Sequence, residues 1–500
     1  MKSLSLSLSL WVGILAAAPL SAQATYTAHS MDWQGTPVAN HTRAVAVTDT
    51  GFVLCEGIDS TNGHTFVYWS RLRPSNPNNW DQARAPHPGY EESYAGGIAI
   101  TGTGATITGW LRPTAGQLGQ DEGFFWPVDP ANPTVPVTAF KVDGNAVSQP
   151  KGINRDGLMV GRTRTIPNSL YWKGFRRSID LNEPNQELPP LDSSFSRSWA
   201  WGINGAGYTV GASDTTIGPH KTQATAWLPS STARRGLDWL DPALPEAEAK
   251  AVNRGLYAVG WSGASVPGAS LSMVKKAVIW TSPTPQALTD LSGGTILASQ
   301  GDAAQAISAG IPGVLEEEVV GEYWDASQPN PQKLGFVWSQ TGGFQDLRSL
   351  VVSGLPVNEL IVEAKGINSL GEIAATAQDI LGHRYAVLLT PNVSTPRLGR
   401  VNAPLAGAQT VICGIGFAPN TTANLYADDQ TGSFTTTLCG QTVITSVDTS
   451  PSQNLVASVS SDANGRVIFI GSVPQLSFGT KVFFQAMDCL ISNVVEEVIQ

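Results

Sequence analysis

Aromatic residues in segments that we expect to be loops between strands, each with acidic residues nearby, are the side chains most suited to chemistry. The aromatic residues are Trp110, Trp261, Tyr323 and Trp324. The acidic residues of the surrounding segments include Glu91, Glu92, Asp121, Glu122, Glu183, Glu187, Asp192, Asp241, Glu246 and Glu248. Aromatic faces beside carboxylates suit the binding of sugar rings, and paired carboxylates cleave glycosidic bonds. Packing between strands and a soluble surface would explain the same residues more simply, so ligand binding by them is a hypothesis.

Sequence motifs of familiar catalytic centres are missing from the chain. It contains no Gly-x-Ser-x-Gly elbow, no His-Glu-x-x-His, no Gly-rich phosphate loop and no Cys-x-x-Cys. The six histidines show no spacing suited to a metal ion. The sequence therefore predicts no cofactor and no metal, and it favours a non-catalytic protein while leaving enzymatic activity open.

A pattern with a period of about fifty residues runs through most of the chain. It consists of a small residue, Ile or Val, Asn, two variable residues, Gly, and then Val-Gly, followed by a segment that ends in Trp. The clearest copies are Gly152-Ile153-Asn154 through Gly161 and Gly202-Ile203-Asn204 through Gly211. Copies start at residues 46, 97, 152, 202, 251, 306 and 366. The terminal aromatic residues are Trp69, Trp126, Trp172, Trp227, Trp280 and Trp338.

Each copy predicts four short strands. In the Asn-x-x-Gly segment the Asn side chain caps a type I turn, and Gly takes the left-handed position that closes the hairpin. We expect the third strand to carry the Trp and the fourth to carry an Asp-Leu element such as Ile179-Asp180-Leu181. Four-stranded units with aromatic markers are typical of a β-propeller, and seven copies predict seven blades. A solenoid is the alternative.

The two ends of the repeat region predict how the ring closes. Ser30-Met31-Asp32-Trp33 is similar to the fourth-strand element Leu237-Asp238-Trp239, whereas the last copy ends at Leu389-Thr390-Pro391 without such an element. We therefore expect residues 25–35 to supply the outer strand of the last blade and the propeller to span residues 25–391.

These repeats resemble those of the extracellular HAF-repeat proteins of bacteria. That family is named for a His-Ala-Phe step before the Trp, which appears here as His64-Thr65-Phe66 before Trp69 and as His383-Arg384-Tyr385. The resemblance covers roughly residues 40–390. It implies a secreted repeat protein with a propeller-like fold, and it implies no catalytic residue because the family brings no shared catalytic motif.

Residues 392–500 lack the repeat and predict a C-terminal β-sandwich. A Pro- and Ser-containing linker opens this region, and about a hundred residues of alternating strands are the usual size of a sandwich. Cys439 and Cys489 are the favoured disulfide pair, because Cys413 alternates like a residue of a core strand. Cys55 lies alone in the N-terminal part, where a buried thiol is expected. Other pairings within the C-terminal region stay open.

The N-terminus and the composition predict an exported protein. Lys2 precedes an apolar run, and Ala22-Gln23-Ala24 is typical of a cleavage site, so residues 1–24 predict a signal peptide. Charged residues make up 14% of the chain, with 51 Gly and 15 Trp, as in turn-rich β proteins. A net charge of −10 has the wrong sign for nucleic acid. No later segment is apolar enough to span a membrane, and we expect a monomer.

Together these features favour a secreted, non-catalytic binding protein that uses the propeller as its platform. Its partner would be an extracellular glycan or a surface protein. The alternative is a propeller enzyme that acts on an extracellular polysaccharide. Two carboxylates about 5–10 Å apart at the channel, with raised pKa values, would favour the enzyme.

Overall fold

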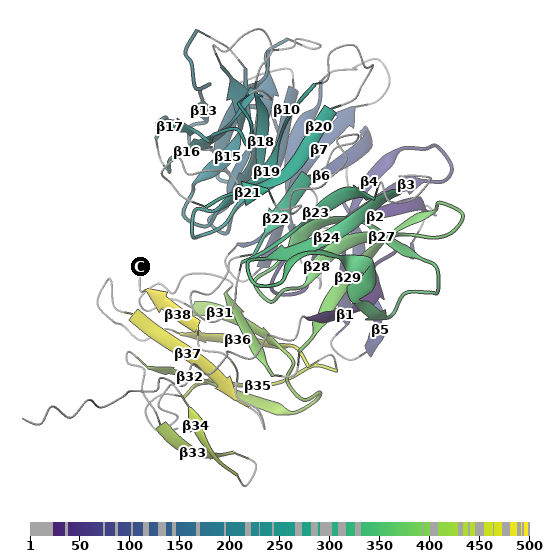
Figure 1. Cartoon of the computed structure of the whole chain (residues 1–500), viewed down its shortest axis with the longest axis vertical. Helices are drawn as coiled ribbons and strands as arrows, with labels where there is room; N and C mark the ends of the chain where they lie inside the picture. Colours follow the sequence, from purple (N-terminus) through teal and green to yellow (C-terminus); the bar gives the residue numbers. More distant parts are fainter. Residues whose placement is uncertain are drawn as a thin grey trace, which may run out of the picture.

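Antiparallel strands make up most of the computed structural model of the chain (Figure 1). It describes residues 24–498 apart from these gaps: 36–38, 74–75, 86–88, 102–103, 114–119, 129–136, 143–146, 167–170, 195–196, 216–221, 230, 243–244, 266–272, 282–288, 291–302, 309–316, 326–331, 394, 401–408, 429–433, 439–440, 446–454, 464, 473–480, 488–491 and 493–494. The predicted signal peptide lies outside the described residues except for Ala24. Within the described part of the chain, helix is confined to the single turn α1 (Leu347–Leu350).

Seven sheets follow one another along residues 25–392, and the first six are meanders of four consecutive strands. The first three sheets are β2 (Ala39–Val47), β3 (Val53–Asp59), β4 (Thr65–Arg73) and β5 (Asn76–Arg84); β6 (Tyr90–Thr101), β7 (Gly104–Pro113), β8 (Glu122–Val128) and β9 (Thr138–Phe140); and β10 (Val147–Ile153), β11 (Leu158–Arg164), β12 (Lys173–Ser178) and β13 (Gln186–Leu188). The next three are β14 (Ser198–Ile203), β15 (Thr209–Asp214), β16 (Thr222–Trp227) and β17 (Arg234–Gly236); β18 (Glu246–Val252), β19 (Ala258–Ser265), β20 (Met273–Trp280) and β21 (Thr289–Asp290); and β22 (Ala303–Ile307), β23 (Glu318–Asp325), β24 (Gln332–Ser339) and β25 (Gly343–Asp346).

The seventh sheet combines the two ends of the repeat region. Its order is β26 (Val351–Ser353), β1 (Thr25–Ser30), β29 (Arg384–Asn392), β28 (Ile373–Gln378) and β27 (Leu360–Ile367). Strand β1 pairs antiparallel with β29 through six residue pairs, from Thr25 with Asn392 to Ser30 with Val387. The short strand β26 adds a parallel partner on the other side of β1. The N-terminal strand is thus hydrogen-bonded into the last sheet.

The first strands of the sheets contact one another in a closed order. Each of β2, β6, β10, β14, β18 and β22 contacts the first strand of the following sheet, and β27 of the seventh sheet contacts β2 of the first. This arrangement of four-stranded sheets around their first strands is that of a β-propeller. Small residues at the repeat starts make it sterically feasible, since a Cβ on Gly202 would lie 2.6 Å from the carbonyl oxygen of Lys250.

In four of the seven repeats an Asn organises the turn and also ties it to the next sheet. The Oδ1 atom of Asn204 accepts hydrogen bonds from the backbone N–H groups of Ala206 and Tyr208, and its Nδ2 donates to the carbonyl of Asn253. Gly207 takes the left-handed conformation, φ +84°, that closes the turn. In the same way, the Nδ2 atom of Asn154 donates to the carbonyl of Asn204. Between the seventh sheet and the first, the Nδ2 atom of Asn368 donates to the carbonyl of Thr48. One side chain therefore specifies both the hairpin and the spacing of neighbouring sheets.

Two sequence expectations about the strands are wrong in the third sheet. Trp172 precedes β12 instead of lying within it, and its ring is covered by the guanidinium groups of Arg162 and Arg164 at 4.2 and 4.5 Å from the centroid. The Ile179-Asp180-Leu181 element lies between β12 and β13, because the carboxylate of Asp180 accepts from the N–H of Asn182 and forms a turn there.

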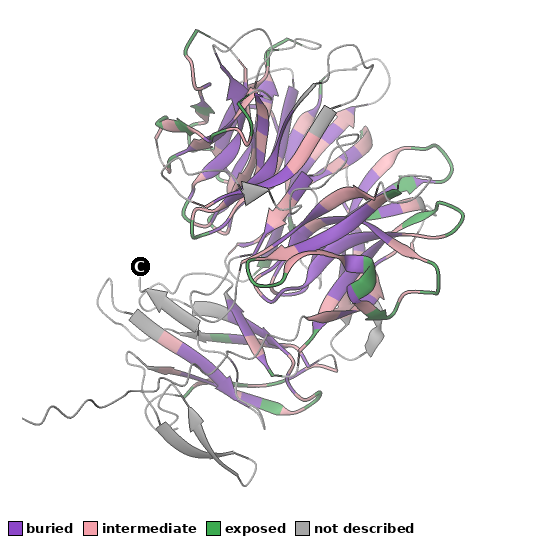
Figure 2. Ribbon diagram, in the orientation of Figure 1, coloured by how far each residue is buried: buried purple, intermediate pink, exposed green. Residues whose placement is uncertain are grey.

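The core is divided among the spaces between neighbouring sheets, as the buried strand segments in Figure 2 show. Trp69, Trp126 and Trp227, each an expected terminal aromatic residue, are among the largest fully buried side chains. Trp69 and Trp126 belong to one apolar cluster that joins the first two sheets. The aromatic markers of the repeat therefore serve packing.

Residues beyond 392 form separate sheets. One consists of β30 (Arg397–Arg400), β31 (Gln409–Ile415) and β36 (Val467–Ser472), and the other of β35 (Leu455–Ser460), β32 (Thr422–Asp428), β37 (Lys481–Met487) and β38 (Val495–Val498). The hairpin β33 (Phe434–Leu438) and β34 (Gln441–Thr445) is a third unit. Ile412 and Phe469 of the first sheet share one apolar cluster with Leu425 and Phe484 of the second.

The cysteines fall partly within the described residues. Cys55 and Cys413 are fully buried free thiols, and burial raises the pKa of each. The predicted disulfide partners Cys439 and Cys489 lie outside the described residues.

A buried ion pair joins the C-terminal region to the propeller. The guanidinium of Arg466 contacts the fully buried carboxylate of Glu372 and donates to the carbonyl of Asp49 at 2.7 Å. The carboxylate of Asp49 in turn accepts from the N–H of Ser369 at 2.8 Å. Turns of the first and seventh sheets therefore meet the C-terminal region at one polar cluster.

Candidate functional site

A β-bulge occurs at the same repeat position in all seven first strands, one residue before the small residue of the motif. The bulged residues are Val45, Gly96, Lys151, Trp201, Lys250, Gln305 and Lys365. A bulge inserts an extra residue and turns its side chain out of the regular pleat. All seven residues are half-buried, and all seven line one cavity of about 460 Å³. We call this the axial cavity, because each sheet contributes one bulged residue to it.

The Val-Gly step of the repeat follows from the bulge. In the second strands, a Cβ on Gly211 would lie 2.0 Å from the carbonyl oxygen of Trp199, and one on Gly260 would lie 1.9 Å from that of Glu248. A Cβ at either of these positions would clash with the bulged backbone of the first strand as it stands. In the first and seventh sheets Cys55 and Ala375 occupy the equivalent position opposite the bulge, so glycine allows the close approach in the other five sheets but is not required for every bulge.

The axial cavity is cationic although the chain is acidic overall. Its described lining holds Arg43, Lys151, Lys250 and Lys365 against one carboxylate, Glu56, which gives 4 − 1 = +3 formal charges in a chain of net charge −10. Glu56 is already engaged, because it pairs with Arg43 at 2.5 Å and accepts from the N–H of Ala95 at 2.7 Å. Glu248 and Glu322, which are not among the lining residues, pair with Lys250 and Lys365 in turn. Lys151 is therefore the lining cation whose charge remains to attract an anion.

Lys151 differs from the other cations of the cavity in having no anionic partner. Its Nζ lies 3.4 Å from the ring centroid of Trp110 and 5.5 Å from that of Trp201. No hydrogen-bond acceptor or carboxylate pairs with this amine within the described part of the chain. Burial, assisted by the nearby charge of Arg162, holds the pKa of Lys151 well below its usual value.

Lys250 is held in a tight cluster. Its Nζ lies 2.5 Å from Glu248 and 3.9 Å from the ring centroid of Trp201. Glu248 also accepts from the indole N–H groups of Trp199 at 2.9 Å and Trp261 at 3.2 Å. Burial alone would raise the pKa of Glu248, but Lys250 and the Trp199 N–H hold it below its usual value. This carboxylate is therefore ionised and engaged.

The sixth and seventh sheets carry a second charged cluster beside the cavity. Lys333 pairs with Glu322 and Glu363 at 2.8 Å each, and Lys365 lies 3.5 Å from Glu322. Burial would raise the pKa of Glu363, but Lys365 and Lys333 hold it below its usual value. Neither Glu248 nor Glu363 therefore has the raised pKa that a general acid needs.

The structure separates the four aromatic residues that the sequence singled out. All lie in second strands and not in loops: Trp110 in β7, Trp261 in β19, and Tyr323 with Trp324 in β23. Trp110 lines the axial cavity and stacks on Tyr94 with ring centroids 5.1 Å apart. Trp261 is only 4% exposed. Tyr323 packs edge-on against Phe344. The four do not share one platform.

Sequence reasoning missed the lysines of the cavity and Trp201. Their signal is present in the repeat, since each stands immediately before the small residue, at a position where the side-chain chemistry varies among copies. The acids near the channel are mostly committed to partners. Arg112, for example, pairs with Glu92 at 2.7 Å and lies 3.5 Å from Asp121.

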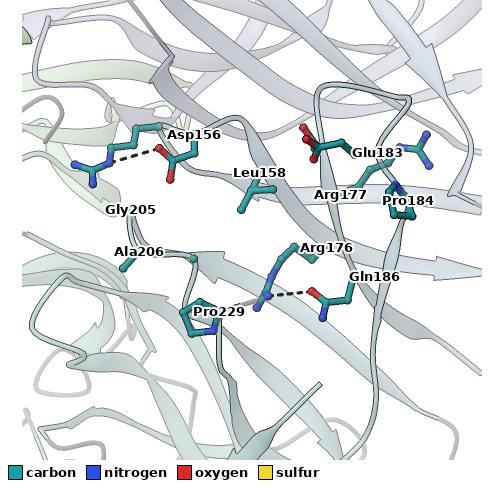
Figure 3. A pocket seen from close by; sticks show the side chains of 13 residues that line it. Asp156, Leu158, Arg176, Arg177, Glu183, Pro184, Gln186, Gly205, Ala206 and Pro229 are labelled. Atoms are coloured by element: carbon teal, nitrogen blue, oxygen red, sulfur yellow. Dashed lines mark hydrogen bonds and ion pairs between the residues drawn. The ribbon is translucent and has the colours of Figure 1, made fainter. Parts of the chain in front are cut away.

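A second depression, of about 580 Å³, lies between the turns of the third and fourth sheets (Figure 3). Arg155 and Asp156 are within 3.8 Å of one another at its edge. Arg176 is buried in its wall, where it donates to Gln186, to Thr209 and to the carbonyl of Leu228. Because these donors are used to join two sheets, we place the candidate site in the axial cavity.

The described residues hold no group of three His, Cys, Asp or Glu side chains arranged to bind a metal ion. Among the same residues, no helix is long and apolar enough to cross a membrane.

Comparisons with known proteins identify no family. No family model and no curated protein matches the chain. Among solved structures, it is similar to the β-propeller domain of the Trilobed protease from Pyrococcus furiosus, with TM-score 0.40 and 9% identity over 71% of this chain and 98% of that one. It is also similar to a tetra-tandem repeat in the extending region of a large adhesion protein, with TM-score 0.14 and 11% identity over 96% of this chain and 100% of that one. Likenesses at these scores carry no argument about function.

Proposed function

We propose that the protein is a secreted, non-catalytic binding protein whose ligand, a glycan, occupies the axial cavity. The observation that carries this proposal is the convergence of one bulged residue from each of seven sheets on a cavity of about 460 Å³. That volume lies within the range of about 300–1,000 Å³ usual for small-ligand sites. Trp201 contributes aromatic surface, whereas the ring of Trp110 is already covered by Tyr94 and by the amine of Lys151. The amines contribute hydrogen-bond donors for sugar oxygens.

The proposed architecture supports a binding platform. We infer that the seven sheets are the blades of one seven-bladed propeller spanning residues 25–391, and that residues 392–500 form a β-sandwich used for attachment or spacing. The closed order of contacts among first strands and the apolar cluster shared by the two C-terminal sheets support these assignments. Export rests on the signal peptide that residues 1–24 predict and on the resemblance to HAF-repeat proteins.

A propeller enzyme that acts on a polysaccharide is the second candidate. Such an enzyme needs two carboxylates, one of them protonated at neutral pH. Glu248 and Glu363 are paired with lysines and have lowered pKa values, which argues against either as the acid. The binding protein is therefore the better-supported proposal.

Co-sedimentation with insoluble polysaccharides tests the two candidates together. Purified residues 25–500 would be incubated with a panel of neutral, carboxylated and sulfated polysaccharides, and the supernatant assayed for protein and for released sugar. We expect the wild type to be retained on at least one polysaccharide without sugar release.

The matched variants are Trp201→Ala in the cavity and Tyr171→Ala, which removes an aromatic ring that is 65% exposed elsewhere. Retention should fall at least tenfold in the first and stay unchanged in the second. Sugar release that a single carboxylate substitution abolishes would establish the enzyme instead, and no retention on any polysaccharide would refute glycan binding.

A further inference from the structure

We propose that the axial cavity selects ligands that carry an oxyanion, a carboxylate or a sulfate, and that Lys151 is the residue that binds it. The inference rests on the proposed function in placing the glycan in this cavity, and it adds the charge of the ligand and the residue that recognises it.

The first step is to identify which cations of the lining are not already paired with a carboxylate of the protein. Arg43 is paired with Glu56, Lys250 with Glu248, and Lys365 lies beside Glu322. Among the lining cations, Lys151 is the one with no carboxylate at ion-pair distance in the described part of the chain, and Glu56 and Asp121 act on it only from farther away. A buried cation without a direct partner is stabilised by loss of its proton or by an external anion.

The second step is the position of the amine. The bulge at Lys151 places this residue on the lining of the cavity, where the ring of Trp110 contacts its ammonium at 3.4 Å. A cation–π contact stabilises the charge of the ammonium, but the aromatic ring does not take the place of an oxygen atom as its hydrogen-bond acceptor. The donors of Lys151 therefore stay available to an oxygen atom in the cavity.

The third step concerns the charged groups around the amine of Lys151. Lys250 and Arg162 approach the same ring of Trp201, at 3.9 and 5.8 Å from its centroid, and Lys151 lies 5.5 Å from it. Glu248 offsets the charge of Lys250, which leaves Lys151 and Arg162 as two like charges near this indole. A neutral sugar would leave that repulsion in place, whereas a uronate or a sulfated sugar would relieve it.

Small soluble probes test the charge selectivity directly. Binding of sodium glucuronate, potassium sulfate and glucose to residues 25–500 would be measured by calorimetry and by tryptophan fluorescence, since Lys151 lies against Trp110. We expect glucuronate or sulfate to bind at least tenfold more tightly than glucose. Because an anion favours the charged amine, binding should raise the lowered pKa of Lys151. Binding should therefore be accompanied by proton uptake as the pH is raised through that pKa, detected as a dependence of the heat on the buffer.

Three variants separate the role of the charge from the role of the fold. Lys151→Met should lose at least tenfold in anion affinity and lose the proton uptake, whereas Lys151→Arg should retain anion preference. Lys173→Met is the matched control, because Lys173 lies in the same sheet, 44% exposed and paired with Glu187. Equal affinity for glucose and glucuronate, or wild-type anion binding by Lys151→Met, would overturn the inference, as would failure of both anions to bind.

The polysaccharide panel distinguishes this result from the proposed function. If wild type and Lys151→Met are retained equally on neutral polysaccharides, the result supports glycan binding and contradicts the oxyanion inference. Anion binding without retention on any polysaccharide would sustain Lys151 as an oxyanion site and refute the glycan. Retention on polyuronates but not on sulfated polymers, or the reverse, would identify which oxyanion the site takes.

Discussion

We expect Lys151 to lower the stability of the folded protein by the same property that suits it to a ligand. Its amine is partly removed from water and lies near Arg162 and Lys250, and it is compensated by aromatic surface and by the more distant charges of Glu56 and Asp121. Groups that fit a ligand commonly lower stability in the unbound protein. Lys250, which has Glu248 at 2.5 Å, does not carry this cost.

We expect Lys151→Met to raise the stability of the unbound protein by about 1 kcal/mol at neutral pH, since the lost cation–π contact offsets part of the regained desolvation energy. The pKa of Lys151 is lowered in the folded state, so between that pKa and about 10.4 the unfolded chain binds more protons. Wild-type stability should therefore rise with pH across this window, and the advantage of the variant should shrink. Thermal unfolding at pH 6 and pH 10 measures both. If Lys151→Met is less stable than wild type at both pH 6 and pH 10, the contacts of the amine in the folded protein outweigh its desolvation.

At the scale of the strand, the bulge and its facing glycine act as one unit. In five of the sheets the extra residue of the first strand brings a carbonyl so close to the second strand that a Cβ would clash with it, whereas Cys55 and Ala375 occupy this position in the first and seventh sheets. This explains why the Val-Gly step recurs although the loops beyond it vary in length. The cavity-facing position is consequently free to carry Lys, Trp, Gln or Val without disturbing the sheet.

Strand β7 offers a matched test of this unit. A Cβ on Gly109 would lie 2.0 Å from the carbonyl oxygen of Tyr94, whereas one on Gly104 would lie 3.8 Å from that of Val128. We expect Gly109→Ala to destabilise by about 3 kcal/mol or more, because backbone must shift, and Gly104→Ala to change stability by less than about 0.5 kcal/mol. Denaturant unfolding of the two variants decides this. Equal effects would show that the second sheet adjusts to a side chain opposite its bulge, as the first and seventh sheets do with Cys55 and Ala375.

At the scale of the whole molecule, three segments distant in the chain meet at one polar cluster. Asp49 lies between β2 and β3, Ser369 between β27 and β28, and Arg466 precedes β36. Burial raises the pKa of Asp49 to about 7, and the nearby charge of Glu372 adds to this effect. The contact between the propeller and the C-terminal region is therefore sensitive to pH.

The direction of that sensitivity follows from the raised pKa. Between pH 4 and 7 the folded state binds more protons at Asp49 than the unfolded chain does, so its stabilising contribution is complete below about pH 4 and declines as the pH rises to 7. We expect Asp49→Asn, which keeps the acceptor for the Ser369 N–H, to remove this decline. The variant should gain more in Tm over wild type at pH 8 than at pH 4. An equal gain at both values would contradict the raised pKa.

Several elements were predictable because their causes are local. Asn204 and Gly207 specify a turn whatever surrounds them, and the alternation of apolar residues between such turns requires strands. The Trp172 and Asp180 expectations failed for the opposite reason. A tryptophan and an Asp-Leu pair have no intrinsic strand position, and arginine packing and an Asx turn decided where they lie.

The candidate site likewise combines features that the local sequence determines with features that tertiary packing decides. The sequence places Trp110, Trp261 and Tyr323 at similar positions with acidic residues nearby, yet one lines the cavity and two are packed among neighbours, since accessibility depends on the adjoining sheet. Repeat period, turn chemistry and strand character follow from nearest neighbours along the chain. The axial cavity and the amine of Lys151 without a carboxylate at ion-pair distance arise only when seven first strands from distant segments meet, because charge and burial are properties of what surrounds a residue in space.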